Sequence, residues 1–201
     1  MRGLYALKPW YTRRLHRLVD AAVARTISPD VFTLLGVLGA AAAGAFLAYG
    51  WAIPAVLALA LRLAGANLDG AVARARGVSR PWGFVLNEIG DRLSDLLMFA
   101  GLAVLAARTG SGWTDTAVVL VALAALAATT PTFASLAAAG AGATRRNGGP
   151  FGKTERCLAA VVAAAVPAWL GAVSLIIIAG SVLTCTLRLL GARRELSRAQ
   201  R

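Results

Sequence analysis

Acidic residues are scarce in this chain, and so are histidine and cysteine. The 201 residues include nine Asp and Glu, one His and two Cys, against 21 Lys and Arg, and 58% of the chain is apolar. His16 stands among arginines, and Cys157 and Cys185 lie in apolar runs, so the sequence contains no His/Cys metal cluster. A net charge of +12 would suggest nucleic acid in a soluble protein. The apolar composition instead favours arginines that face anionic membrane lipids, and we expect no nucleic-acid partner.

Charge is absent altogether from two long stretches of the sequence. Residues 31–61 and 157–187 each form an uncharged run of 31 residues, too long for one membrane span of about 20 residues. Gly50, Trp51 and Pro54 mark a turn in the first run, and the second is interrupted around 167–174. The sequence therefore predicts an all-α, polytopic membrane bundle of about six transmembrane helices. The predicted spans are 31–50, 52–75, 83–107, 114–138 and two within 157–187.

The N-terminal residues are polar and basic, without the early apolar core of a signal peptide. Residues 8–25 place leucine and valine at helical spacing among arginines, which predicts an amphipathic helix on the membrane surface. A solvated charged helix also fits this pattern. We divide the chain into an amphipathic juxtamembrane segment (1–27), a six-helix membrane domain (28–190) and a basic cytoplasmic tail (191–201).

Basic residues and tryptophans orient the predicted bundle. Among the 21 basic residues, only Arg108 falls near an outer loop. Trp51, Trp113 and Trp169 fall near the three outer turns, as expected for an aromatic belt. Both patterns predict an integral, multi-pass cell-membrane protein with both termini in the cytoplasm.

Four of the nine acids fall within residues 67–95, between long apolar runs: Asp69, Glu88, Asp91 and Asp95. Acids among membrane helices are costly, so this group indicates a functional site. The spacing is specific. Asp69-Gly70 is followed by Ala73-Arg74 and Gly83, and then by Asn87 and Asp91 at four-residue steps.

This pattern resembles the signature of the CDP-alcohol phosphatidyltransferase family, in which Asp and Asp-Gly precede Ala-Arg, Gly and two further Asp. The residues in register are Asp69, Gly70, Ala73, Arg74, Gly83 and Asp91. Ala66 and Asn87 stand where the family has its first and third aspartates. The resemblance implies a homodimeric membrane enzyme of phospholipid biosynthesis. It would move a phosphatidyl or phospho-alcohol group from a CDP-linked lipid donor to a small alcohol acceptor and release CMP.

The resemblance also implies site roles. Asp91 would be the general base on the acceptor hydroxyl and a metal contact, Asp69 would bind metal, and Asn87 could add its carbonyl oxygen. The cofactor would be Mg²⁺ (or Mn²⁺), which takes hard oxygen ligands. The substrate-binding residues in the motif would be Gly70, Ala73, Arg74 and Gly83, where small side chains admit the substrate and one cation faces phosphate.

A basic, glycine-rich loop is the second candidate. Arg145, Arg146, Lys153 and Arg156 surround the sequence GGPFGK, so backbone amides and cations could bind phosphate there. Positive charge on an inner loop explains the same residues equally well. For Glu88 and Asp95, ion pairing with Arg92 competes with metal binding.

The two missing aspartates leave three outcomes open. In the first, one metal suffices; in the second, Asn67, Glu88 or Asp95 compensates; in the third, catalysis is lost. The leading interpretation is a CDP-alcohol phosphotransferase. The alternative is a catalytically silent relative that binds nucleotide or lipid as a membrane partner protein. A small transporter with acids in its pathway is a third, against which the Asp-Gly-Ala-Arg cluster argues.

Overall fold

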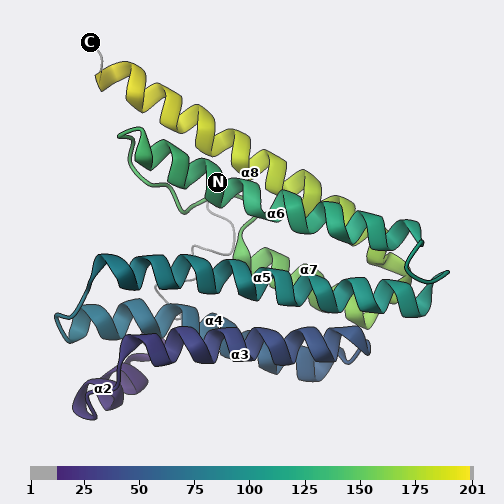
Figure 1. Cartoon of the computed structure of the whole chain (residues 1–201), viewed down its shortest axis with the longest axis horizontal. Coiled ribbons are helices and arrows are strands. Elements are labelled where there is room, and N and C mark those ends of the chain that lie inside the picture. Colours follow the sequence, from purple (N-terminus) through teal and green to yellow (C-terminus); the bar gives the residue numbers. More distant parts are fainter. Residues whose placement is uncertain (1–12, 200–201) are drawn as a thin grey trace.

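The computed structural model describes residues 13–199, and that part of the chain is helical with no strand. Seven α-helices follow one another (Figure 1): α2 His16–Ala24, α3 Pro29–Ala48, α4 Ala52–Ala75, α5 Pro81–Thr109, α6 Thr116–Gly140, α7 Lys153–Ala165 and α8 Leu170–Ala199, with a 3₁₀ turn, η2 Pro167–Trp169, before α8. The predicted all-α architecture is confirmed. Helices α3 to α6 begin and end within about two residues of the spans expected from the apolar periodicity.

Helix starts follow from local chemistry. Pro29 and Pro81 occupy the first turn of α3 and α5, where the missing N–H costs nothing. Asp115 caps α6 by accepting a hydrogen bond from the backbone N–H of Ala117 at 2.8 Å. The backbone N–H groups of Ser111 and Ala117 hold the pKa of Asp115 below its ordinary value. This cap therefore stabilises the turn above the ordinary pKa, and its contribution disappears as the pH falls through the lowered pKa.

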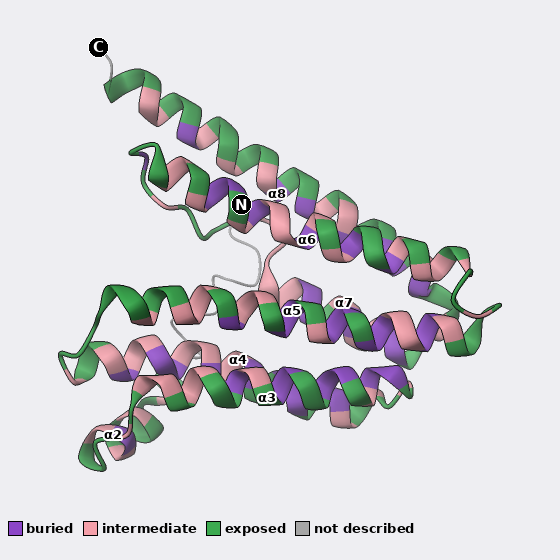
Figure 2. Cartoon of the chain, in the orientation of Figure 1, coloured by how far each residue is buried: buried purple, intermediate pink, exposed green. Residues whose placement is uncertain are grey.

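Figure 1 shows two groups of helices. Helices α3, α4 and α5 run alongside one another, with α7 behind α5, and α6 and α8 form an inclined pair. Buried residues lie on the faces where these helices meet (Figure 2). The core joins both groups through residues such as Leu47, Met98, Leu102, Val121 and Ile177.

Glycines allow the first group to pack closely. A Cβ on Gly101 of α5 would lie 2.2 Å from the carbonyl oxygen of Gly44 on α3. A Cβ on Gly65 of α4 would lie 2.7 Å from the Cα of Gly36 on α3. Close backbone approach at small residues is typical of helices packed in lipid. Gly65 lies one helical turn before Asp69, so this contact also fixes the position of that acid.

Four helical segments are long and apolar enough to cross a membrane: α3, α4, α6 and Pro167–Ala199, which contains η2 and α8. Helix α5 does not qualify by composition, because its first half carries Glu88, Asp91, Arg92 and Asp95. Helix α7 has 13 residues, or about 20 Å at 1.5 Å per residue, less than a hydrocarbon core of about 30 Å. Six helices occupy the predicted positions, and six complete crossings stay a prediction.

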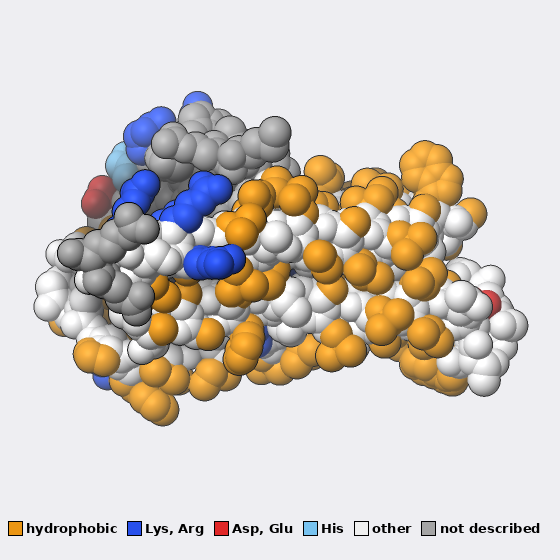
Figure 3. Space-filling view, turned by 90° about the horizontal axis from the view of Figure 1, so that it is seen from above, with side chains coloured by type: hydrophobic (Ala, Val, Ile, Leu, Met, Phe, Trp, Pro, Cys, Tyr) orange, Lys and Arg blue, Asp and Glu red, His pale blue; other side chains and the backbone are white. Residues whose placement is uncertain are grey.

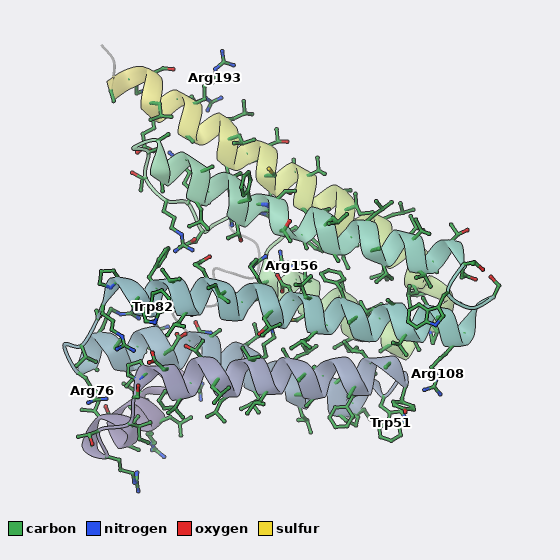
Figure 4. All side chains as sticks on the ribbon, viewed as in Figure 1. Trp51, Arg76, Trp82, Arg108, Arg156 and Arg193 are labelled. Carbon is green, nitrogen blue, oxygen red and sulfur yellow. The ribbon has the colours of Figure 1, made fainter. Side chains whose placement is uncertain are left out.

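Charged and aromatic residues separate along the molecule. In Figure 3, Lys and Arg side chains gather toward one end, and hydrophobic side chains are spread over the remainder of the described surface in view. In Figure 4, Arg76, Trp82 and Arg193 lie toward one end, and Trp51 and Arg108 toward the other. The first end is the one that the sequence predicts to face the cytoplasm.

The chain outside the bundle is only partly described. Helix α2 covers half of the predicted surface helix, and residues 8–12 lie outside the described residues. Ala22 of α2 is buried, while Leu18 is exposed. At the other end α8 continues unbroken from the membrane domain to Ala199, so residue 191 begins no separate element. The three-part division of the chain stays a prediction.

Because Gly101 lies so close to Gly44, adding a single methyl group at Gly101 should destabilise the fold. Gly101→Ala should lower the free energy of unfolding in detergent by about 1–3 kcal/mol, the usual cost of overpacking. Gly140→Ala is the matched control, because no atom lies within 4 Å of its added Cβ. Equal unfolding transitions for the two variants would contradict the close packing of α3 on α5.

Candidate functional site

A cavity of about 360 Å³ lies between the first half of α5 and the segment that runs from the α6–α7 loop into α7. Ala66 and Asn67 of α4, Pro131 of α6 and Arg188 of α8 complete its wall. Five cations and three acids line the cavity: Arg92, Arg145, Lys153, Arg156, Arg188, Glu88, Asp91 and Glu155. The lining therefore carries an excess of positive charge and suits an anionic ligand.

Asp69 lies beside this cavity and is 6% exposed. Its Oδ2 accepts hydrogen bonds from the amide nitrogen of Asn87 and from Thr33 Oγ1 at 3.0 Å. Its Oδ1 accepts one from the backbone N–H of Gly70 at 2.5 Å. Asn87 itself lines the cavity. Because its amide nitrogen faces Asp69, its carbonyl oxygen remains available as an acceptor.

Asp91 lines the cavity one helical turn beyond Asn87, on the same face of α5. Lys153, the first residue of α7, places its Nζ 2.6 Å and 2.7 Å from the two carboxylate oxygens of Asp91. The structure thus joins two predicted site residues that are 62 positions apart. Neither side chain is fully buried, so the pair remains accessible from the cavity.

Glu88 is paired across the same cavity, but its partner differs from the prediction. Its carboxylate binds Arg145, whose guanidinium also lies 4.7 Å from the centre of the Phe84 ring. Arg92, the partner expected from the four-residue spacing, binds Asp95 instead at 3.0 Å. The prediction of a Glu88–Arg92 pair is wrong, because Arg145 reaches Glu88 from the loop. The ion-pair interpretation of Asp95 is confirmed.

Asp95 binds three arginines from three helices. Arg62 of α4 binds its Oδ1, and Arg156 of α7 donates to its Oδ2 at 2.9 Å. Arg62, Asp95 and Arg156 are 1%, 2% and 4% exposed. Arg62 also donates to Cys157 Sγ at 3.2 Å. Burying so much charge is tolerable only because each group has partners, and the cluster still carries more positive than negative charge.

The remaining predicted substrate residues lie outside the cavity lining. Arg74 folds back along α4, and a Cβ on Gly70 would lie 3.1 Å from its Nη1. Ala73 and Gly83 lie on α4 and α5, away from the lining. Arg146 binds Glu195 of α8 at 3.0 Å. Among the predicted substrate-binding residues, only Arg145 and Lys153 line the cavity.

Sequence reasoning missed three residues of this site. Thr33 is an uncharged residue three positions after Asp30, and no motif in the sequence marks it. Arg92 was considered only as an ion-pair partner of Glu88 and Asp95, and not as part of the cavity lining. Arg188 is the first charge after the uncharged run 157–187, a signal that could have identified it. It donates to the backbone carbonyls of Pro131 and Asn147, each at 2.7 Å, and so ties α8 to α6 and the loop.

The predicted metal ligands form a small donor set. Asp69 and Asp91 offer carboxylates on either side of Asn87, which offers one amide oxygen. Among the described residues, no group of three or more His, Cys, Asp or Glu side chains could hold a metal ion. The donors thus fit one hard cation that shares its coordination with substrate and water, and not a cage built by protein alone.

Apolar helices around a cavity that combines acids with excess arginine define a membrane protein whose site suits a phosphorylated ligand. The chain belongs to the CDP-alcohol phosphatidyltransferase family, whose model matches residues 26–187. It is accordingly a membrane phosphotransferase of phospholipid synthesis, as the motif predicted.

Relatives with curated names support this family. A protein of Aquifex aeolicus named as uncharacterized is 33% identical over 150 residues, covering 75% of this chain and 74% of that protein. Phosphatidylinositol phosphate synthase of Mycobacteroides abscessus is 30% identical over 159 residues, covering 79% and 70%. The enzyme of the same name from Cutibacterium acnes is 29% identical over 114 residues, or 56% of this chain and 55% of that enzyme.

Solved structures share the fold. Mycobacterium tuberculosis phosphatidylinositol phosphate synthase with CDP-DAG bound superposes with a TM-score of 0.75 at 24% identity, over 90% of this chain and 94% of that one. The same enzyme with manganese and citrate gives 0.73 at 24% identity, over 88% and 87%. At this identity the likeness concerns the fold.

The Asp95 cluster predicts that losing the charge of Asp95 destabilises the protein more than losing the charge of a surface acid. Asp95→Asn leaves buried arginines without a counter-charge and should lower the free energy of unfolding by about 3–5 kcal/mol. Asp30→Asn is the control, since Asp30 pairs with Arg80 where the side chains are 39% and 54% exposed, and should cost about 0–1 kcal/mol. Denaturant unfolding in one detergent compares them. Similar losses would argue against the cluster as a structural centre.

Proposed function

We propose that this protein transfers a phosphatidyl or other phospho-alcohol group from a CDP-linked lipid donor to the hydroxyl of a small alcohol acceptor, and releases CMP. The observation that carries the proposal is the position of Asp91, which matches the last motif aspartate and lines the cavity beside Asn87. The family supports the reaction class. The fold shared with an enzyme that binds CDP-DAG supports a CDP-linked lipid donor.

One divalent cation, Mg²⁺ or Mn²⁺, fits this site. Asp69, Asp91 and the carbonyl oxygen of Asn87 would hold it, because Mg²⁺ commonly takes one or two carboxylates and completes its shell with substrate phosphates and water. When bound, the ion supplies Lewis-acid polarisation of the donor phosphates. The relative with manganese and citrate supports use of a divalent metal.

The proton of the acceptor hydroxyl needs a base, and a side chain of this protein provides it. Asp91 accepts the proton of the acceptor hydroxyl as its oxygen attacks the donor phosphorus, since Asn87 can take none. Asn87 and Thr33 hold Asp69 in place through its Oδ2. Lys153 fixes the orientation of the Asp91 carboxylate by contacting both oxygens.

The acceptor, in this proposal, is a phosphorylated alcohol. The cavity lining has five cations against three acids, and Arg92 and Arg156 are drawn together by Asp95. An acceptor that brings its own phosphate would satisfy this charge, whereas serine or a simple polyol would not. The names of two relatives point to the same class of acceptor.

The protein, as we propose it, is a multi-pass homodimer with both termini in the cytoplasm. The support for the orientation is that Arg76 and Arg193 lie toward one end of the bundle and Trp51 toward the other, with Arg108 as the one basic exception (Figure 4). Membrane lipids would cover the exposed leucines and isoleucines of α3, α4, α6 and α8. Family resemblance supports the dimer.

Orientation can be tested with single cysteines in a cysteine-free background. An added Cβ meets nothing within 4 Å at Gly148 or at Gly112. Gly112 has a φ of +92°, so a cysteine there strains the backbone, and the folding of that variant is checked first. An impermeant thiol reagent should label Gly148→Cys from the cytoplasmic side and Gly112→Cys from the outside. Labelling of Gly148→Cys only from the outside would contradict the orientation.

Turnover of radiolabelled CDP-diacylglycerol tests the reaction and Asp91 together. Asp91→Asn should reduce turnover by the ~10²–10⁴-fold typical of general acid–base catalysis, while donor binding persists. Asp30→Asn on the exposed surface of α3 is the matched control and should keep wild-type turnover. Equal turnover in wild type and Asp91→Asn would remove Asp91 from the reaction.

The same assay separates an enzyme from a silent relative. Turnover that appears only after Ala66→Asp and Asn87→Asp together would identify the natural chain as silent. A panel of glycerol phosphate, inositol phosphate, serine and unphosphorylated polyols tests the acceptor class. Turnover should be confined to the phosphorylated members, and turnover with serine alone would contradict the proposal.

A further inference from the structure

Lys153 is exceptional in this chain. It is the only lysine within residues 13–199, where every other basic side chain except His16 is arginine. Arginine presents a planar fork, whereas lysine presents a compact point charge. The one lysine lies in the cavity, with a single nitrogen 2.6 Å and 2.7 Å from the two oxygens of Asp91. A point cation shared between both oxygens of one carboxylate is the arrangement that a bidentate metal ion would also adopt.

The position of Lys153 in its helix needs an explanation. It is the first residue of α7, a 13-residue helix. Cations are disfavoured at helix N-termini, because the helix dipole is positive there. The same end favours phosphate, which backbone N–H groups and the dipole attract. A lysine at this end is therefore costly by itself, and the pair with Asp91 and an anionic ligand in the cavity would offset that cost.

Lys153 can bind a second group while it binds Asp91. The ammonium has three N–H donors, and the two Asp91 contacts account for two of them. Its side chain is 25% exposed. A phosphate oxygen in the cavity could therefore accept the third hydrogen bond without breaking the ion pair.

The few acids around Lys153 limit the number of metal ions that this site can hold. Two-metal sites place ions about 3.5–4 Å apart and stabilise both the attacking and the leaving oxygen. Such a pair of ions needs several carboxylates. Here Ala66 and Asn87 stand at two of the four motif positions, and one of the two remaining acids, Asp91, shares its carboxylate with Lys153.

We propose that Lys153 supplies the second positive charge on the donor pyrophosphate, so that this chain works with one divalent cation and one protein ammonium. The inference rests on the proposed function. As the acceptor oxygen bonds to the donor phosphorus, the bond from that phosphorus to the bridging oxygen breaks. The acceptor proton goes to Asp91, the electron pair stays on the CMP oxygen, and Lys153 donates a hydrogen bond to the CMP phosphate.

Metal stoichiometry tests the inference without relying on turnover. Purified protein is titrated with Mn²⁺ at saturating CDP, and free Mn²⁺ is followed by electron paramagnetic resonance. Wild type should bind one Mn²⁺ per chain. The variant that combines Ala66→Asp, Asn87→Asp and Lys153→Gln should bind two. Two Mn²⁺ in wild type would overturn the inference while leaving the proposed transfer reaction intact, and absence of both CDP and Mn²⁺ binding would overturn both.

CDP affinity provides the second measurement. Lys153→Gln keeps a hydrogen-bond donor for Asp91 but removes the charge, so the fold should persist. Its CDP affinity should fall about 10- to 100-fold, as expected for one charge-assisted hydrogen bond. Arg193→Gln, at an exposed position of α8, is the matched control for lost charge and should bind CDP as wild type does. Wild-type CDP affinity in Lys153→Gln would overturn the inference.

Discussion

The cost of burying charge among apolar helices governs this structure. An isolated ion in such a setting loses its hydration, so each charged group must lie against a partner of opposite sign. Asp95 meets that requirement for Arg62, Arg92 and Arg156, and the three bonds bring α4, α5 and α7 together at one point. Helix α7 is short, and its bond to Asp95 adds to the contacts that Cys157, Ala160 and Ala163 make with the apolar core.

The acids of α5 form a stripe that matches a stripe of bases in order along the chain. Glu88 binds Arg145, Asp91 binds Lys153, and Asp95 binds Arg156. The three acids follow one another at steps of three and four residues, which keeps them on one helix face. The segment from the loop into α7 therefore packs along α5 through these three ion pairs. The cavity lies between the row of acids and the row of bases. The site and the fold depend on the same pairs.

Sequence reasoning reached the helices and the acids but not their partners. Apolar periodicity and proline positions locate α3 to α6 because those signals are local. Asp69 and Asp91 could be identified as candidate functional residues because acids are rare in apolar sequence. Their contacts were not, since Lys153 and Asp91 are 62 residues apart and Thr33 and Asp69 are 36 apart, distances over which no spacing rule operates. The placement of Gly83 and Arg74 away from the cavity lining likewise depends on how helices rotate in the bundle, and that of Arg146 on its pair with Glu195 of α8, neither of which one sequence determines.

Helix α8 spans more than the bilayer requires. Its 30 residues extend about 45 Å, roughly 15 Å beyond a hydrocarbon core of about 30 Å. Near the far end, Glu195 accepts hydrogen bonds from the backbone N–H and the hydroxyl of Thr144, at 2.7 Å and 2.6 Å, in the loop that leads to the cavity. The loop is thus held by the C-terminal part of α8. This helix begins directly after Trp169, at the opposite end of the bundle. Helices tilt to match the thickness of the surrounding lipid. A change in bilayer thickness should therefore change the tilt of α8 and move the loop that forms one wall of this cavity.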